Sequence, residues 1–118
     1  MVKTTQLEHK IRCWGFRVED EKQSIVFITD TLPTEQSIAF AEIADHFIHE
    51  ATFTDNHSEL AGETKHTTIS QAIEIGEKAG VKHIYLTHFS PRIEDEELLK
   101  LEQKYNFIGL QHNQKLFI

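Results

Sequence analysis

The sequence predicts an α/β fold, with a mixed sheet of about five to six strands and three helices. Three observations indicate this fold. Short segments with strand character alternate with longer segments of helical spacing. Residues 25–28 form an uninterrupted apolar run, and Thr68 begins a helix with a capping box. The chain has 118 residues, of which 39% are hydrophobic and 26% are charged, so it has room for one domain at most.

Residues 10–18 are predicted to form the first strand, because this mixed segment has several apolar side chains available for a core. The polar segment 19–23 is expected to turn the chain into a second strand at residues 24–29, which should be buried on both faces. Thr34 can cap a helix that continues to about residue 44. Residues 46–50 are expected to form a further short strand.

The second half of the chain contains the clearest helix. Residues 54–65 are polar and are expected to form a surface loop. Thr68 and Gln71 then form a capping box, and Gly80 can end the helix. The remaining predicted elements are a strand at 83–87, a helix at 94–105, and two strands at 107–110 and 115–118 around a turn at 111–114.

Charge and composition narrow the function classes. Twelve basic and nineteen acidic residues give a net charge of −7, which argues against a basic face that grips nucleic acid unaided. Eight histidines in so acidic a chain favour metal or acid–base chemistry. One cysteine excludes a disulfide framework and fits a reducing cytoplasm. No apolar run approaches the roughly 20 residues of a membrane span.

Three predicted strands end in a residue that can bind a metal or move a proton. Asp30, Glu50 and His88 hold these positions, and in α/β sheets ligands lie beyond the carboxyl ends of the strands. If the strands are parallel neighbours, the three side chains project into one crevice. His66 precedes the capped helix and could form a carboxylate–imidazole pair with Glu50. The alternative is that each residue is an ordinary polar group where the chain meets solvent.

Several ordered sequence blocks resemble one enzyme family. The blocks are IHEATF at 48–53, HTT at 66–68 and LTHFSPR at 86–92, together with residues 7–9, 15–18 and 24–31 in the same order. They resemble ribonuclease Z, the tRNA 3′-processing endonuclease of the metallo-β-lactamase superfamily. The resemblance runs from about residue 7 to residue 93. It implies a hydrolase with an αββα sandwich fold.

The resemblance also implies residue roles. His9, Asp30 and His88 would be metal ligands of a centre that holds two Zn²⁺ ions in its complete form, with Asp30 between the ions; such ligands also accept Mn²⁺ or Fe²⁺. Glu50 and His66 would protonate the departing 3′ oxygen of a tRNA precursor or other RNA phosphodiester. Further along the chain, Ser90 and Arg92 would contact the substrate phosphate.

The chain also departs from the family pattern. The string His-x-His-x-Asp-His, which supplies four ligands in the family, does not occur in it. We therefore expect residues 1–118 to be a single unit, the C-terminal half of the fold, with an incomplete ligand set and an uncovered sheet face. Such a unit would be inactive alone. It would associate with itself, as in the family's usual homodimer, or with a complementary N-terminal half.

Two alternative functions follow from these departures. Only a short turn lies between residues 18 and 24, where many bacterial relatives insert a tRNA-gripping arm. With the acidic charge, this favours a small-nucleotide phosphodiesterase of the same superfamily as one alternative. The missing ligand string favours the other, a non-catalytic, truncated binding or assembly module.

Overall fold

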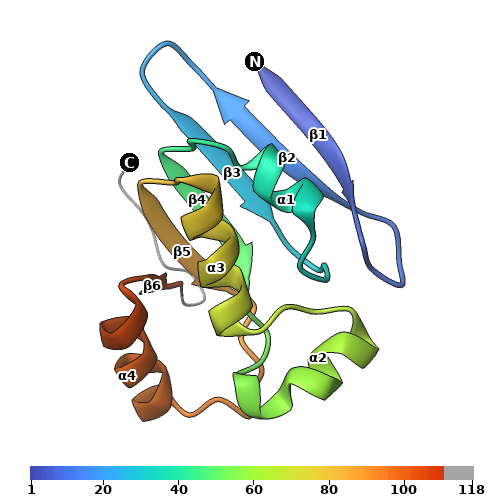
Figure 1. Ribbon diagram of the computed structural model, residues 1–118, viewed down its shortest axis with the longest axis vertical. Coiled ribbons are helices and arrows are strands. Elements are labelled where there is room, and N and C mark those ends of the chain that lie inside the picture. Colours follow the sequence, from blue (N-terminus) through green and yellow to red (C-terminus); the bar gives the residue numbers. More distant parts are fainter. Residues whose placement is uncertain (111–118) are drawn as a thin grey trace.

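The computed structural model describes residues 1–110, which form one six-stranded sheet with helices against it (Figure 1). The strands are β1 Val2–Leu7, β2 Cys13–Glu19, β3 Ser24–Ile28, β4 His46–Glu50, β5 His83–Thr87 and β6 Ile108–Gly109. Their order in the sheet equals their order in the chain. Strand β2 is antiparallel to both of its neighbours, β1 and β3, whereas β3 to β6 are parallel. The mixed sheet and the α/β class are as predicted.

Helices make the connections between the parallel strands. They are α1 Glu35–Phe40, the 3₁₀ turn η1 Asp55–His57, α2 Ser58–Thr64, α3 Ile69–Ala79 and α4 Asp95–Tyr105. Helices α1 and α3 pack against each other over one face of the sheet, as Figure 1 shows. The capping box of α3 forms as predicted, with Thr68 and Gln71 as its two members and Gly80 in the left-handed conformation at the other end.

The structure corrects two expectations about the elements and adds one strand. Residues 54–65 are not a loop, because η1 and α2 occupy most of them and bury Ala61; the described residues thus hold four α-helices rather than three. Strand β1 was not predicted at all. The first predicted strand begins at Cys13 rather than residue 10. The predicted strand at 115–118 and the turn before it lie outside the described residues.

Helix α1 ends four residues earlier than expected. Ile43 has a φ of 56°, a left-handed conformation that no helix continues through. The Arg17 guanidinium donates hydrogen bonds to the carbonyls of Phe40 (2.9 Å) and Glu42 (3.0 Å). These bonds satisfy backbone acceptors that a helix end leaves free. A side chain from β2 therefore helps to end α1.

The two faces of the sheet differ in what covers them. Val26, Ile28 and Phe47 point toward the helices and are fully buried. Phe27 lies between Val26 and Ile28 on the opposite face and is 40% exposed, so the expectation that this strand is buried on both faces is wrong. We call the side that carries Phe27 the open face. No described helix lies over it.

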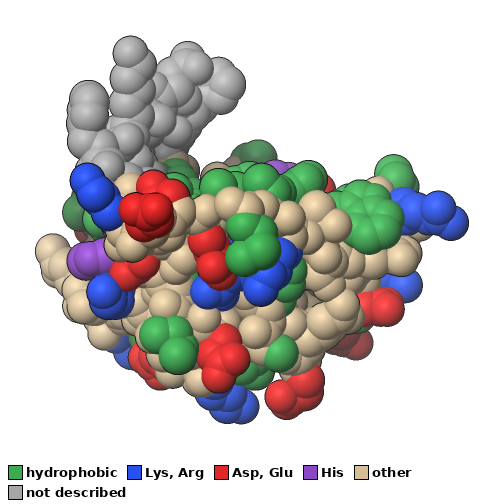
Figure 2. Space-filling model, turned by 90° about the horizontal axis from the view of Figure 1, so that it is seen from above, with side chains coloured by type: hydrophobic (Ala, Val, Ile, Leu, Met, Phe, Trp, Pro, Cys, Tyr) green, Lys and Arg blue, Asp and Glu red, His purple; other side chains and the backbone are tan. Residues whose placement is uncertain are grey.

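Hydrophobic side chains gather on the open face, along the upper margin of the molecule in Figure 2. Trp14, Phe16 and Val18 of β2 belong to it, and each is between 44% and 48% exposed. By contrast, Cys13 of the same strand packs against the core, where desolvation and the nearby Asp30 carboxylate raise the pKa of its thiol. Among the described helices, none is long and apolar enough to cross a membrane.

Candidate metal and acid–base site

Asp30 and His88 stand just beyond the carboxyl ends of β3 and β5, and both have left-handed backbone. Their φ angles are 54° and 64°, a region that costs a non-glycine residue on the order of 1 kcal/mol. The turn in the backbone brings the side chains together, with Asp30 Oδ1 3.5 Å from His88 Nδ1. Strained residues of this kind cluster at functional sites, where surrounding structure holds them in place.

Glu50 ends β4 and is fully buried, and both oxygens of its carboxylate accept hydrogen bonds. Oε1 accepts from the backbone N–H groups of Thr31 (3.2 Å) and Thr67 (2.9 Å). Oε2 accepts from the backbone N–H (3.0 Å) and the hydroxyl (2.7 Å) of Thr52. All of these partners are donors, which is the set that an ionised carboxylate accepts. The carboxylate is thereby fixed in one orientation at the edge of the sheet.

His66 provides the remaining contact of Glu50. Its Nδ1 lies 3.1 Å from Glu50 Oε1 and 4.0 Å from Asp30 Oδ1. Two neighbours hold this residue: Lys65 adopts the left-handed conformation that ends α2, and Thr68 caps α3. His66 is therefore placed by two helix ends, and the structure brings it together with Glu50 as the sequence predicted.

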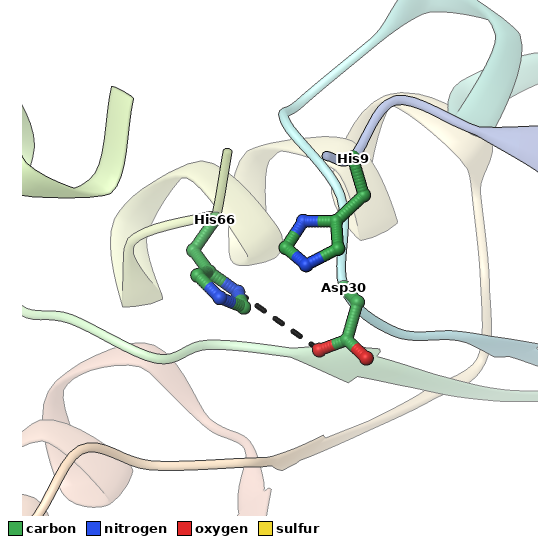
Figure 3. Close-up of side chains that lie close together, drawn as sticks. All are labelled: His9, Asp30 and His66. Atoms are coloured by element: carbon green, nitrogen blue, oxygen red, sulfur yellow. Dashed lines mark ion pairs between the residues drawn. The ribbon is translucent and has the colours of Figure 1, made fainter. Parts of the chain in front are cut away.

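His9 approaches the same edge from the loop between β1 and β2. Its Nδ1 lies 2.9 Å from the Lys65 carbonyl oxygen, and its ring centroid is 4.8 Å from that of His66. Hydrogen bonds from Glu8 N to Thr31 Oγ1 (3.2 Å) and from Leu32 N to the Glu8 carbonyl (3.0 Å) tie this loop to the one that follows β3. Figure 3 shows His9 and His66 turned toward Asp30.

Two overlapping groups of side chains have donor atoms close enough to share a metal ion. One group is His9, Asp30 and His66, and the other is Glu50, His66 and His88; within each, the donor atoms lie within 4.8 Å of one another. Imidazole nitrogens and carboxylate oxygens are ligands that Zn²⁺ accepts. The residues present thus fit a zinc centre in their chemistry. The three predicted ligands are divided between the two groups, with His9 and Asp30 in one and His88 in the other.

Ser90 and Arg92 lie on the loop after His88. Ser90 N donates to the Thr52 carbonyl (2.8 Å), and Arg92 N donates to Ser90 Oγ (3.2 Å), while the Arg92 side chain is exposed. A groove of about 490 Å³ opens beside this loop, lined by Thr87, His88, Phe89, Ser90, Pro91, Ile93, Asp95, Leu98 and Leu110. Ser90 therefore borders a concave surface next to His88, whereas Arg92 is not among its lining residues.

Sequence reasoning missed the threonines that surround Glu50. Thr31, Thr52 and Thr67 bind its carboxylate through three backbone N–H groups and one hydroxyl. Thr67 also donates its own hydroxyl to the Thr31 carbonyl (2.6 Å), which links two of these loops. Their positions in the sequence could have indicated them, because two directly follow predicted site residues and the third lies two positions after one. Thr31 follows Asp30, Thr67 follows His66, and Thr52 comes two residues after Glu50.

Other histidines lie away from this edge. The His49 side chain is fully buried among core residues, its Nδ1 is 2.6 Å from the Glu50 carbonyl oxygen, and desolvation lowers its pKa. His49 therefore lies on the face of β4 opposite to Glu50. On the open face His46 and His83 stack with ring centroids 5.3 Å apart, and His46 Nδ1 contacts the Tyr85 hydroxyl at 3.1 Å.

The mixed sheet, with imidazoles and carboxylates gathered at the carboxyl ends of its parallel strands, defines an α/β domain of the metallo-β-lactamase type. Residues 2–89 match the family model described as "Beta-lactamase superfamily domain", and the chain belongs to this family. The share of the chain that matches includes every residue of the site up to His88.

Within this family the chain is similar to proteins of the ribonuclease Z branch, as the sequence blocks indicated. The chain is 45% identical over 75 residues to the ribonuclease Z of Brevibacillus brevis, a match covering 64% of this chain. It is 37% identical over 91 residues, 77% of this chain, to a zinc phosphodiesterase ELAC protein 2 homolog of Caenorhabditis elegans. These segments are 24% and 11% of the two relatives, so the match spans only part of their length.

Solved structures share the fold. The short form of human tRNase Z superposes with a TM-score of 0.74 at 28% identity, covering 93% of this chain and 38% of that one. The metallo-β-lactamase fold protein YhfI of Bacillus subtilis superposes with a TM-score of 0.80 at 22% identity, covering 92% of this chain and 44% of its own. In both, more than half of the compared protein lies outside the region that this chain matches.

Proposed function

We propose that this chain is part of a metal-dependent phosphodiesterase of the ribonuclease Z type that acts in tRNA 3′ processing in the cytoplasm. The observation that carries the proposal is the Glu50–His66 pair beside the Asp30–His88 contact. In this combination, side chains suited to acid–base chemistry and to metal binding lie at one edge of one sheet. The ribonuclease Z relatives support the choice of RNA as substrate.

His9, Asp30 and His88 would be metal ligands of a centre that in its complete form holds two Zn²⁺ ions. Bound zinc supplies a Lewis acid that activates water and neutralises charge on a phosphate. The chain's own acid–base pair does the remaining work. Glu50 accepts from His66 Nδ1 and orients the ring, so that His66 Nε2 can give a proton to the departing 3′ oxygen.

The groove beside His88 is the proposed position of the substrate's phosphate backbone. Ser90 lines it and offers a hydroxyl, and the Arg92 guanidinium can reach toward a phosphate from the exposed side of the loop. Both contacts are proposed for the ground state and the transition state alike, so they would mainly affect substrate affinity.

The open face is the proposed docking surface for a complementary N-terminal half of the fold. Residues of one cross-strand row on this face are Thr4, Phe16, Phe27, Ile48, Tyr85 and Ile108, none of which is charged. Uncharged aromatic and aliphatic rows suit packing against a second sheet. The size of the compared structures, of which this chain covers 44% or less, supports a partner of at least similar size.

Mixing this chain with the N-terminal half of the Brevibacillus brevis ribonuclease Z tests the proposal. We expect a one-to-one complex that binds zinc and cleaves a tRNA precursor with a 3′ trailer. His66→Gln should lower the rate by about 10²–10⁴-fold, whereas His57→Gln, which changes a histidine of η1 outside the site, should not.

The same mixture separates the alternatives. Cleavage of a small diester such as bis(p-nitrophenyl) phosphate without cleavage of the tRNA precursor would favour the small-nucleotide phosphodiesterase. The short turn at residues 20–23 and the net charge of −7 support this alternative. A complex that binds zinc and cleaves neither substrate would favour a binding or assembly module. A homodimer of this chain that excludes the added half would replace the proposed partner.

A further inference from the structure

The Thr52 hydroxyl lies at the centre of the site and contacts three of its side chains. It is 2.7 Å from Glu50 Oε2, 3.0 Å from His88 Nδ1 and 3.2 Å from His66 Nδ1. Thr52 is 8% exposed and lies just beyond β4, two residues after Glu50. One small hydroxyl therefore joins the buried Glu50 carboxylate to the imidazoles of His66 and His88.

Proton counting assigns a direction to each of these contacts. A hydroxyl has one proton to donate and lone pairs that accept, and an ionised carboxylate can only accept. The Thr52 proton therefore goes to Glu50 Oε2, which is also the shortest of the three contacts. Toward both imidazoles the Thr52 oxygen can act only as an acceptor, so each Nδ1 that bonds to it must carry a proton.

The consequence is sharpest at His88. Its Nδ1 faces Thr52 Oγ1 at 3.0 Å and Asp30 Oδ1 at 3.5 Å, and both oxygens accept. The Thr52 contact is the better hydrogen bond, because 3.5 Å is beyond the usual range for N–H···O. A neutral His88 with its proton on Nδ1 leaves the lone pair on Nε2. His66 differs, because Glu50 Oε1 at 3.1 Å offers its Nδ1 a second acceptor at normal hydrogen-bond distance.

We propose that Thr52 is a positioning residue whose hydroxyl fixes the Nδ1–H tautomer of His88 and so presents the His88 Nε2 lone pair for a metal ion. The use of that lone pair rests on the proposed function, but the tautomer does not. Through Glu50, the same hydroxyl links the orientation of His88 to the carboxylate that holds His66.

The backbone of Thr52 is held independently of its hydroxyl, which makes a clean substitution available. Thr52 N donates to Glu50 Oε2, and the Thr52 carbonyl accepts from Ser90 N. Thr52→Val keeps both bonds and nearly the same side-chain shape while it removes the hydroxyl. Thr52→Ser keeps the hydroxyl. Thr67→Val is the matched control, because it removes a buried hydroxyl that bonds to the Thr31 carbonyl and to neither imidazole.

Nitrogen-15 NMR of the histidine side chains in the metal-free, full 118-residue chain tests the proposal. Spectra taken well above the ordinary histidine pKa of about 6.5 report the neutral tautomers. We expect Nδ1–H for both His66 and His88 in the wild type. Thr52→Val should lose the Nδ1–H form of His88 and keep that of His66, whereas Thr52→Ser and Thr67→Val should keep both.

Three results would overturn the proposal. They are an Nε2–H tautomer of His88 in the wild type, an unchanged His88 in Thr52→Val, and equal changes in Thr52→Val and Thr52→Ser. The wild-type spectrum alone decides the first, so the test does not depend on the folding of any variant. Failure of zinc binding or RNA cleavage with the His88 tautomer as expected would count against the proposed function alone.

Discussion

The two faces of the sheet are built from alternate residues of the same strands, yet they differ in how they are completed. On the helix-covered face, Val26 and Phe47 are neighbours across β3 and β4 and are fully buried. On the open face, Phe27 is the neighbour of Phe16 and Ile48, and both phenylalanines are at least 40% exposed. The pleat explains the alternation, but only the helices explain the burial.

The comparison shows which parts of the fold are fully packed by residues of this chain. The covered face supplies a close-packed core, and the carboxyl edge of the sheet supplies a carboxylate with every oxygen hydrogen-bonded. On the open face, in contrast, the two cross-strand rows that pass through Phe16 and Val18 contain no Lys, Arg, Asp or Glu, which is unlike an ordinary solvated surface. Substitutions on the two faces should therefore act on different quantities.

The largest contrast is expected between Phe47→Ala and Phe27→Ala. Phe47 is fully buried between the sheet and the helices, so its truncation should lower the free energy of unfolding by about 3–5 kcal/mol. Phe27 is 40% exposed, and its truncation should cost less than about 1 kcal/mol. Urea unfolding followed by circular dichroism measures both. If Phe47→Ala does not fold, Phe47→Leu gives the same sign with a smaller loss, and equal losses at the two positions would refute the contrast.

A second contrast uses two helical glycines. A Cβ at Gly76 would lie 2.8 Å from Ile84 Cδ1 and 3.3 Å from Phe47 Cδ2, so the Ile84 side chain or α3 itself would have to shift. Gly76→Ala should therefore destabilise the chain by about 1–2 kcal/mol despite the better helix propensity of alanine. Gly62 of α2 has open space around its Cβ position, and Gly62→Ala should stabilise by about 0.5–1 kcal/mol. A gain in thermal stability for both variants would contradict the close contact.

The elements that the sequence predicted well are those with strong local signals. The α3 capping box at Thr68 and Gln71, and the strands β4 and β5, all lie where the pattern placed them. Strand β1 has only two apolar residues in six and is an edge strand, so it has no alternation to detect. Helix α2 contains Gly62 and buries only Ala61, and tertiary packing rather than periodicity places it.

The residues of the site also differ in how well the sequence predicts their positions. Asp30, Glu50 and His88 were predicted together because parallel strands end at one edge, a rule that needs only strand positions. The contact of His9 with Lys65 joins residues 56 positions apart, and the Thr52 hydroxyl depends on atomic distances. Neither can be predicted from one sequence, because loop paths and side-chain rotamers are set by packing. The burial of β3 on both faces was mispredicted for a related reason, since an apolar run does not say what covers it.

A third effect is the pH dependence of stability, which should follow the buried His49. Desolvation lowers the pKa of His49 in the folded chain, so below the ordinary histidine pKa of about 6.5 the unfolded chain binds more protons. Stability should therefore fall as the pH is lowered from about 7 toward the folded pKa. The slope from this group is at most about 1.4 kcal/mol per pH unit.

Urea midpoints between about pH 7.5 and 5.5 measure this slope. In that range the carboxylates whose pKa is lowered in the folded chain, such as Asp45 at about 2, are ionised in both states and do not contribute. His46 of the open face is the comparison, since desolvation and His83 also lower its pKa. His46→Gln should remove the smaller part of the slope, because His46 keeps some exposure. A flat profile in the wild type would show that neither imidazole resists protonation.

The smallest effect on stability, and the most specific effect on assembly, is expected from Phe27→Lys. The position is partly exposed and flanked by Phe16 and Ile48, so a lysine can extend its ammonium group into water at a cost within about 0.5–1 kcal/mol. A sheet packed over this row would bury the charge, which is far more costly. Phe27→Lys should therefore abolish binding of the complementary half in analytical ultracentrifugation while circular dichroism stays unchanged. Leu99→Lys, at a 56% exposed position of α4, should leave the binding intact. Equal binding by wild type and Phe27→Lys would place the docking surface elsewhere. The two faces would then differ only in how far their side chains are buried.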